Sequence, residues 1–247
     1  MSEQLNIFAQ TAADAAPAAS QPEEPPAAAA SDPAAQMAQM ERAAADCTKC
    51  GLARTRTQVV WGTGPVPARV VFIGEAPGRR EDAGGEPFIG AAGKILDELL
   101  ERAHIRRADI YITNIVKCRP PENRDPADSE IVACRDYLNA QLRLLRPRVI
   151  VTLGAFATRL ILQTGAGISG LQGRVFETHG LQVLPLYHPA ATIYDSNKRD
   201  PLFAAAPLLD RLANGDGAPC TTPTAGVAPA APTAAATQPA PVGQEDS

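Results

Sequence analysis

The stretch that decides the fold is RVVFIGEAPG, residues 69–78. Its first six residues are mostly apolar on successive positions, which is typical of a parallel strand buried on both faces. A tight loop with two glycines and a proline follows, and the carboxylate of Glu75 stands directly at the strand's end. Three later runs have the same character and are predicted strands: residues 110–116 (IYITNIV), 148–153 (RVIVTL) and 182–187 (QVLPLY).

Helical patterns separate these predicted strands. Residues 90–103 and 155–162 are expected helices, a longer one is predicted over 126–145 with Asp125 as its N-cap, and 202–212 closes the series. Alternation of strands and helices predicts an α/β protein in which a parallel sheet lies between helix layers. Such sheets bind ligands at the carboxyl ends of their strands, so the residues just after each strand are the candidates for function.

Both ends of the chain are rich in alanine and proline and carry no lysine or arginine. We therefore predict disordered tails over residues 1–39 and 214–247 and one folded domain over 40–213. The whole chain has 23 basic and 27 acidic residues and a net charge of −4. All 23 basic residues but only 19 of the acidic ones lie in the predicted domain, which is therefore mildly basic. This sign permits a nucleic-acid partner without demanding one.

No basic segment followed by an apolar run opens the chain, and no stretch of eighteen apolar residues is present. We therefore expect a cytoplasmic protein with no membrane partner. Disulfides are rare in the cytoplasm, so the five cysteines call for another explanation. Cys220 lies in the predicted C-terminal tail and is interpreted as incidental.

The other four cysteines are candidates for a metal site. Cys47 and Cys50 form a Cys-x2-Cys pair in polar sequence before the first strand, whereas Cys118 and Cys134 lie far along the chain. The plainer alternative is four small buried side chains, but the polar setting of the close pair argues against it. Four thiolates suit either zinc or an iron–sulfur cluster, and their spacing does not decide between these metals.

Four polar or aromatic residues near predicted strand ends are the candidate site. Glu75 follows the first strand, and Phe88 lies in a loop bounded by proline and glycine. Asn114 interrupts an apolar run, where burying its amide is unfavourable unless it is paired. His188 follows the last strand. The plainer alternatives are a surface turn for the first loop, a ring that packs under its loop, and a histidine that caps its strand.

Taken together, these segments resemble the family-four uracil-DNA glycosylases, the iron–sulfur branch of their superfamily. The motifs are GEAPGRRED (74–82), EPFIG (86–90), ITNIVKCRPPENR (112–124) and HPAA (188–191), with the four cysteines. The resemblance extends from Cys47 to about Leu212. It implies a three-layer α/β/α sandwich with a central, mainly parallel sheet, here four-stranded, and a 4Fe–4S cluster on Cys47, Cys50, Cys118 and Cys134. It also implies that uracil is bound by Gly74, Glu75, Ala76, Phe88, Asn114 and His188.

The resemblance implies a monofunctional DNA repair enzyme. We expect it to flip uracil out of single- or double-stranded DNA and to hydrolyse the glycosidic bond, with Glu75 and His188 as the catalytic residues. Phe88 would stack on the base and Asn114 would read its polar edge. We expect a monomer. A related branch that links covalently to DNA carries a histidine in an insertion after the second strand. No histidine stands between Cys118 and Cys134 here, so we expect turnover rather than a covalent link to DNA.

Two other functions fit parts of the sequence. A non-hydrolytic iron–sulfur module for DNA binding or electron transfer would explain the cysteines and the basic domain, but not three polar side chains at three strand ends. A nucleotide-binding enzyme with structural zinc is disfavoured by the acidic first loop, which lacks the lysine of a phosphate-binding loop. Residues 192–199, which follow HPAA, are expected to meet DNA, with Lys198 and Arg199 on phosphates.

Overall fold

The computed structural model describes residues 32–216 of the 247. The parts of the predicted tails that span 1–31 and 217–247 lie outside this range. The predicted N-terminal boundary is wrong by several residues, because helix α1 (Pro33–Ala45) begins well before residue 40. Its Met37 is buried, and the Met37 sulfur accepts a hydrogen bond from the Trp61 indole at 3.3 Å. An alanine-rich helix is therefore held by buried Met37 and Ala44, which composition alone does not reveal.

The centre of the molecule is a five-stranded sheet in the order β2-β1-β3-β5-β4. Four strands are parallel, at the places that the apolar runs predicted: β1 (Val70–Gly74), β2 (Tyr111–Asn114), β3 (Val149–Leu153) and β5 (Leu181–Leu186). All residues of β1, β2 and β3 are buried, as expected for strands covered on both faces.

The predicted count of four strands is one short. The fifth strand, β4 (Phe176–Thr178), is antiparallel to β5 at the edge of the sheet. A two-residue turn joins them, in which His179 and Gly180 both have positive φ angles, as tight hairpin turns require. Three residues are too few for an alternating pattern, and histidine is an unusual first residue of such a turn, so no local pattern indicated this hairpin.

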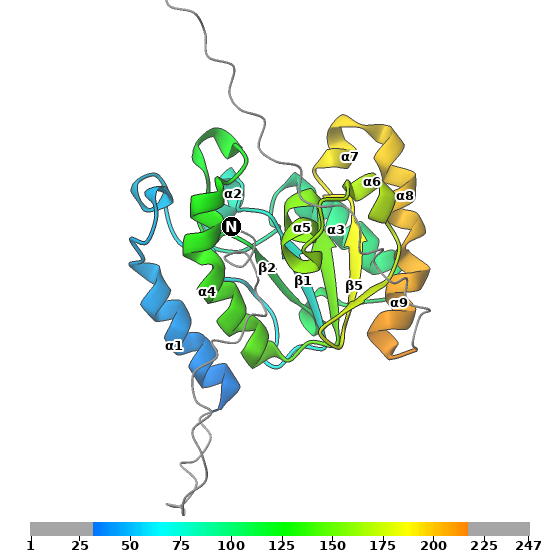
Figure 1. The fold of residues 1–247 in the computed structure, drawn as a ribbon, viewed down its shortest axis with the longest axis horizontal. Coiled ribbons are helices and arrows are strands. Elements are labelled where there is room, and N and C mark those ends of the chain that lie inside the picture. Colours follow the sequence, from blue (N-terminus) through cyan, green and yellow to red (C-terminus); the bar gives the residue numbers. More distant parts are fainter. Residues whose placement is uncertain (1–31, 217–247) are drawn as a thin grey trace, which may run out of the picture.

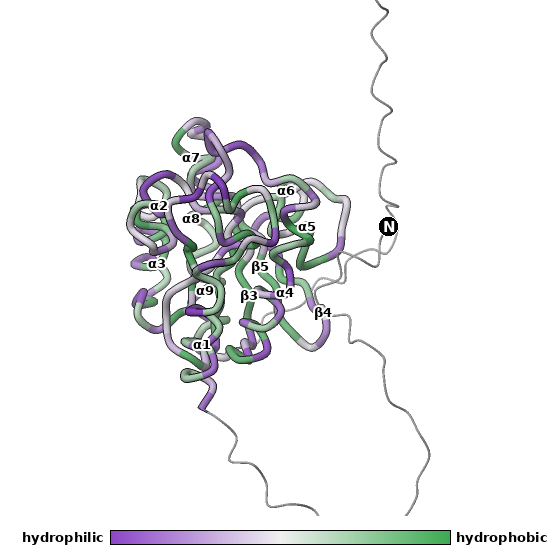
Figure 2. Tube along the Cα trace, turned by 90° about the vertical axis from the view of Figure 1, so that its left-hand side faces the viewer, coloured by the Kyte–Doolittle hydropathy of each residue, from purple (hydrophilic) through white to green (hydrophobic). Residues whose placement is uncertain are grey.

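Helices cover both faces of the sheet, which confirms the three-layer α/β/α prediction (Figure 1). One face packs against α1, α4 (Asp128–Leu145) and α5 (Ala155–Leu162). The other packs against α3 (Ala91–Arg102), α8 (Arg199–Ala204) and α9 (Ala206–Asn214). The hydropathy colouring shows the apolar strands β3 and β5 inside these layers (Figure 2). The remaining short helices are α2 (Arg79–Gly84), α6 (Ile168–Leu171), α7 (Ala191–Tyr194), η2 (Gly51–Arg54), η3 (Arg107–Asp109), η4 (Pro121–Asn123) and η5 (Ser196–Lys198).

Two helix boundaries differ from the predictions for local reasons. Helix α4 begins at Asp128 rather than 126, because the Glu130 carboxylate reaches back to accept the Ala127 N–H at 2.8 Å and fixes the helix start there. The helix predicted over 202–212 is two helices, α8 and α9, which meet at Ala205. Neither difference moves the strand ends, where Gly74 pairs with Asn114 across β1 and β2.

Candidate active site

A cavity of about 450 Å³ lies at the carboxyl ends of the parallel strands. Five of the six residues predicted to bind a base line it: Glu75, Ala76, Phe88, Asn114 and His188. The sixth, Gly74, supports the cavity from below. A Cβ atom on Gly74 would lie 2.4 Å from the Asn114 Oδ1 and 2.8 Å from the Phe88 ring. Any larger residue at position 74 would therefore displace the Asn114 amide or the Phe88 ring. The volume suits a small-molecule or nucleotide-sized ligand.

The Asn114 amide is buried at the wall of this cavity, with 2% of the residue exposed. Its Oδ1 atom has no hydrogen-bond partner among the described residues. A buried acceptor without a partner is unfavourable by about 1–3 kcal/mol, and the place of this one at the cavity wall suits a ligand that supplies the donor. The Asn114 carbonyl, by contrast, accepts a hydrogen bond from the Lys117 ammonium at 2.8 Å. The backbone is therefore fixed while the side-chain oxygen stays available.

His188 faces the same cavity as a neutral imidazole. Burial lowers its pKa to about 4, against a smaller opposing effect of the Glu81 carboxylate. Its Nδ1 accepts the Ala190 N–H at 3.1 Å, which places the single ring proton on Nε2. The imidazole stacks on Phe88 with ring centroids 5.6 Å apart. This side chain can thus donate one hydrogen bond at neutral pH without carrying a charge.

Glu75 is a half-buried carboxyl group whose pKa is raised to about 7, chiefly by burial and further by the Asp125 carboxylate, while Arg159 lowers it. The carbonyl of Glu75 accepts the Val116 N–H at 3.2 Å, and that of Gly74 accepts the Ile115 N–H at 2.9 Å. These bonds tie the loop after β1 to the segment after β2. A carboxyl with a pKa near neutrality that lines the same cavity as a neutral imidazole is an arrangement suited to acid–base chemistry.

The segment after His188, which was expected to meet DNA, forms α7, η5 and the start of α8. Arg199 donates to the Glu98 carboxylate at 2.6 Å, and Lys198 pairs with Asp195 at 3.2 Å, so both cations expected on phosphates already have carboxylate partners. Tyr194, which is 90% exposed, lines the cavity instead. Its exposure could not be read from the sequence, although an aromatic residue within a polar run was a signal.

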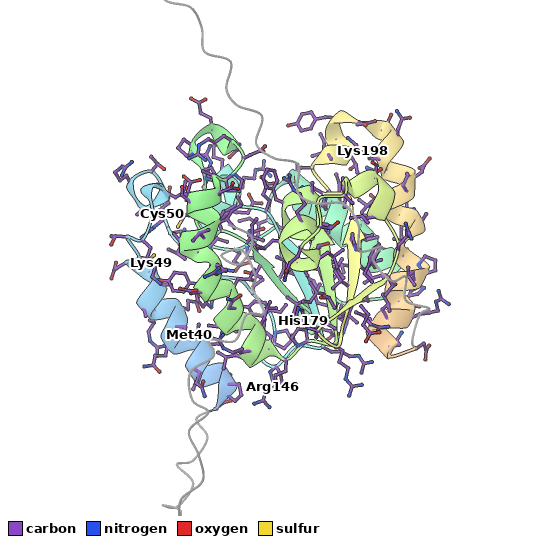
Figure 3. All side chains as sticks on the ribbon, viewed as in Figure 1. Met40, Lys49, Cys50, Arg146, His179 and Lys198 are labelled. Atoms are coloured by element: carbon purple, nitrogen blue, oxygen red, sulfur yellow. The ribbon has the colours of Figure 1, made fainter. Side chains whose placement is uncertain are left out.

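The four cysteines line one hollow, separate from the base-sized cavity. All are free thiols; Cys118 and Cys134 are buried, and Cys47 and Cys50 are half-buried. Figure 3 shows Cys50 beside the upper end of α4, far across the view from Lys198. Arg56 approaches the Cys118 sulfur at 3.5 Å, and burial raises the pKa of this thiol to about 11 against the effect of Arg56. The gathering of all four around one space disfavours their being ordinary core side chains.

Lys117 lies next to this hollow and was missed by sequence reasoning. It is 1% exposed, and its ammonium donates to Thr113 Oγ1 at 2.6 Å and Gln141 Oε1 at 2.5 Å, besides the Asn114 carbonyl. All three acceptors are neutral. A lysine inside the apolar run before Cys118 was the signal that could have revealed it, since such a residue is rarely buried without a specific role.

In residues 32–216, no three His, Cys, Asp or Glu side chains converge closely enough to hold a metal ion. The same range contains no helix that is both long and apolar enough to cross a bilayer.

The family model described as the uracil DNA glycosylase superfamily matches residues 61–209. The Type-4 uracil-DNA glycosylase of Archaeoglobus fulgidus is 47% identical over 167 residues, which cover 64% of this chain and 84% of the relative. The Type-4 enzyme of Thermotoga maritima is 45% identical over 146 residues, 58% and 76% of the two chains.

A more distant relative is also informative. The Type-5 uracil-DNA glycosylase of Pyrobaculum aerophilum is 33% identical over 162 residues, 56% of this chain and 71% of the relative. The segment that the family model matches, residues 61–209, includes the whole sheet and every residue that lines the cavity at the strand ends. This chain belongs to the uracil-DNA glycosylase superfamily.

Proposed function

We propose that this protein removes uracil from DNA by hydrolysis of the glycosidic bond, as a monofunctional DNA repair enzyme. Membership of the superfamily supports the reaction class. The observation that carries the proposal is the cavity at the strand ends, where an unpaired buried acceptor, a neutral imidazole and an aromatic ring face one space. A flat, neutral ligand with a hydrogen-bonding edge fits these groups.

Recognition of uracil follows from the unpaired Asn114 oxygen. A glycosylase must flip its target nucleotide out of the duplex before it can reach the bond. Uracil carries an N3–H donor, which can meet the Asn114 Oδ1. Cytosine has an unprotonated N3 at this position, so two acceptors would face each other and neither would have a donor. Phe88 supplies the stacking surface for the flipped base.

His188 is proposed to stabilise the departing base. Cleavage leaves negative charge on the uracil oxygen beside the broken bond, and fixed donors in a site with little water are effective at holding such charge. The Nε2–H of His188 is available because its Nδ1 is bonded to the Ala190 N–H. Backbone N–H groups of Gly74–Ala76 are the second set of donors. The imidazole acts as a neutral hydrogen-bond donor, since its pKa of about 4 keeps it uncharged.

Glu75 is proposed to act on the other product of bond cleavage. The sugar develops positive charge, and a carboxylate at the end of β1 can stabilise it and orient the attacking water. Since its pKa is about 7, Glu75 is ionised in a large fraction of molecules at neutral pH and can also take up the proton of the water. No lysine lines the cavity among the described residues, which is consistent with hydrolysis rather than an amine-linked lyase step.

The cysteine hollow is proposed to hold a 4Fe–4S cluster on Cys47, Cys50, Cys118 and Cys134. Four thiolates satisfy its four irons. A zinc ion would draw the sulfurs to about 2.3 Å from one point. The four cysteines line one space, as a group with four thiolate ligands requires, and the resemblance to the iron–sulfur branch favours the cluster. The cluster would supply a fixed crosslink: its ligands come from the segment after α1, the segment after β2, and α4. No step of the reaction is assigned to it.

We further propose that the enzyme acts on uracil in single- or double-stranded DNA, as a monomer, in the cytoplasm. The exposed Tyr194 on α7, at the cavity mouth, is a surface against which the DNA strand can lie. An electron-transfer or DNA-binding module without hydrolysis would not need a carboxyl with a pKa near 7 and an unpaired amide oxygen in the same cavity.

The test is base release from matched duplexes with U:G, U:A and T:G pairs and from uracil-containing single strands, together with iron and sulfide analysis. We expect uracil release from every uracil substrate, no release of thymine, and about four irons per chain. Uncleaved substrates with tight DNA binding would favour the non-hydrolytic module. Colourless protein with one zinc per chain would refute the cluster while leaving the glycosylase proposal to the release assay.

A further inference from the structure

Phe88, the proposed stacking residue, has an unusual backbone. Its φ angle is +55°, in the left-handed region that residues with a side chain rarely adopt. The residue is nevertheless buried, with 6% exposed, and its ring lines the cavity. Such a conformation persists only where surrounding contacts determine it, and it is frequent at functional sites. The contacts that hold this loop therefore also determine where the ring lies.

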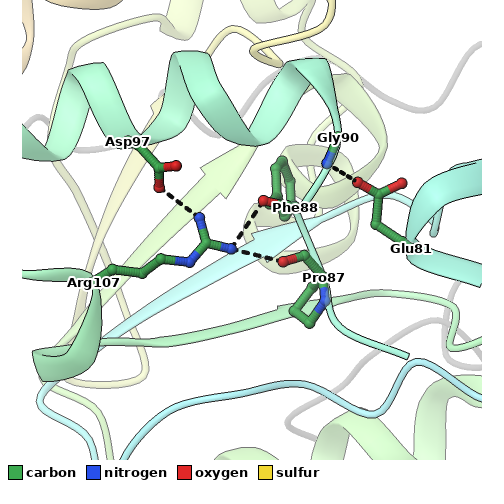
Figure 4. A network of polar contacts seen from close by, with 6 residues as sticks. All are labelled: Glu81, Pro87, Phe88, Gly90, Asp97 and Arg107. Atoms are coloured by element: carbon green, nitrogen blue, oxygen red, sulfur yellow. Dashed lines mark hydrogen bonds and ion pairs between the residues drawn. The ribbon is translucent and has the colours of Figure 1, made fainter. Parts of the chain in front are cut away.

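Arg107 holds the loop from one side (Figure 4). One nitrogen of its guanidinium donates to two successive carbonyls, Pro87 O at 2.7 Å and Phe88 O at 3.0 Å. The other terminal nitrogen pairs with the Asp97 carboxylate on α3 at 2.7 Å. A planar guanidinium with several fixed donors can make these three contacts together, whereas a lysine ammonium is a compact point charge that cannot span them.

Glu81 holds the loop from the other side. Its Oε1 on α2 accepts the Gly90 N–H at 2.8 Å, two residues beyond Phe88 (Figure 4). Close packing adds a third restraint, because a Cβ atom on Gly93 of α3 would lie 1.8 Å from the Phe88 carbonyl oxygen. The four residues from Pro87 to Gly90 are thus fixed by α2, α3 and η3 at once.

We propose that Arg107 and Glu81 are positioning residues that lock Phe88 in its left-handed conformation and so set the ring as one wall of the base pocket, beside His188. The proposal rests on the proposed stacking role of Phe88. Arg107 does not line the cavity. It can affect a bound base only by positioning Phe88, through the Pro87 and Phe88 carbonyls to which it donates. Its loss should therefore affect base release through the ring and leave DNA binding, which depends mostly on phosphate contacts, nearly intact.

The chain offers a matched control in the adjacent residue. Arg106 also pairs with a carboxylate, Asp109, at 2.7 Å, but it is largely exposed and contacts neither the loop nor the cavity. Arg106→Gln removes one arginine and one ion pair, as Arg107→Gln does, without touching Phe88.

The experiment measures single-turnover uracil release, uracil-DNA affinity and thermal stability for the full chain with its cluster. We expect Arg107→Gln to slow release about 10- to 100-fold, the scale of a small misplacement in an active site, with DNA affinity nearly unchanged. Arg106→Gln should behave as wild type. Arg107→Lys keeps the charge and the aliphatic stem, and it should also be slow, so it decides the matter if Arg107→Gln does not fold. Wild-type release by Arg107→Lys or Arg107→Gln would overturn the proposal.

A double-mutant cycle with Phe88→Ala separates this proposal from the one on which it rests. If Arg107 acts through the ring, Arg107→Gln should cause little further loss in a Phe88→Ala background. A full additional loss there would show that Arg107 acts elsewhere and would refute the positioning role. Normal release by Phe88→Ala alone would instead refute the stacking role of Phe88.

Glu81 supplies a conservative rescue. The amide oxygen of Gln can still accept the Gly90 N–H, so Glu81→Gln should retain most of the activity that Glu81→Ala loses. Glu81 also lines the cavity, and its charge acts on His188, so equal losses in the two variants would assign the effect to that charge and would remove Glu81 from the proposal.

Discussion

The cysteine hollow and the base cavity differ in whether their buried polar groups have hydrogen-bond partners. Beside the cysteine hollow, the buried Lys117 ammonium has three acceptors, and each lies within hydrogen-bonding distance. In the base cavity, the buried Asn114 oxygen has no partner among the described residues. The first arrangement is complete within the protein and suits a permanent structural centre. The second is incomplete and suits a ligand that enters and leaves, which the enzyme must bind in each cycle.

One short segment serves both places. Residues 114–118 begin with the Asn114 side chain in the base cavity and end with Cys118 in the cysteine hollow. Lys117 binds the Asn114 carbonyl with its ammonium, and its own backbone N–H donates to the Cys134 sulfur at 3.3 Å. A change in the cysteine hollow should therefore reach the base cavity through Asn114.

The largest expected effect comes from the cysteine hollow. Cys134→Ser should abolish iron binding and most uracil release, because it removes a proposed ligand and weakens a contact of the segment that carries Asn114. Absorbance of the cluster, iron content and thermal stability measure the first loss, and single-turnover release measures the second. Cys220→Ser, at a cysteine outside the described residues, is the control and should keep both. Intact iron content in Cys134→Ser would contradict the ligand assignment.

In the base cavity, Glu75→Gln should slow uracil release about 100-fold or more, the usual scale for losing a general base. Because the carboxylate is the active form and its pKa is about 7, wild-type release should rise with pH through this value. Glu75→Gln should lose that rise. Uracil-DNA affinity and iron content should stay unchanged, in contrast with Cys134→Ser.

The same raised pKa has an opposite consequence for stability. The folded protein binds the Glu75 proton more tightly than the unfolded chain, whose pKa is the ordinary 4.5. Its contribution to stability is therefore present below pH 4.5 and is lost as pH rises through about 7. Thermal unfolding should show that Glu75→Gln is more stable than wild type at pH 8, and that this gain in stability is smaller at pH 5. A gain that does not change with pH would mean that burial does not raise this pKa.

His188→Ala should slow uracil release about 10²- to 10³-fold, the scale for one lost donor to a developing anion. Apart from the rise due to Glu75, the rate of wild-type uracil release should show no separate change near pH 6.5, because burial holds the His188 pKa at about 4. Affinity for uracil-containing DNA, measured separately, should change far less. Near-normal release by both His188→Ala and Glu75→Gln would mean that the catalytic centre lies elsewhere in the protein.

Asn114→Asp tests the unpaired acceptor directly. A carboxyl at this buried place is expected to be protonated, and its hydroxyl can donate to the unprotonated N3 of cytosine. Uracil release should fall about 10- to 100-fold, the equivalent of one mispaired buried hydrogen bond, and slow cytosine release should become measurable. Equal rates on uracil for Asn114→Asp and wild type would show that Asn114 does not read the base.

The sequence predicted the parts of this structure that local patterns encode. Successive apolar residues gave the four parallel strands, and strand ends gave Glu75, Asn114 and His188, because a parallel sheet brings its carboxyl ends to one edge. Contacts distant in sequence were not accessible. Arg107 reaches a loop about twenty residues earlier, and Lys117 finds Gln141 on α4. No local pattern indicates which arginine or lysine will have such partners.

The smallest expected effect concerns the ends of the chain, where the prediction now needs the corrected boundary. A chain of residues 32–216 should release uracil at the full rate, since every residue of both hollows lies within it. A chain that begins at residue 40 should differ, because it lacks Met37, which is 5% exposed and contacts Trp61. Removing a buried side chain of this size destabilises a protein by about 2–5 kcal/mol. Thermal unfolding of the two shortened chains beside the full chain would measure this difference. A shortened chain 32–216 with reduced release would give the end segments a part in catalysis that neither hollow requires.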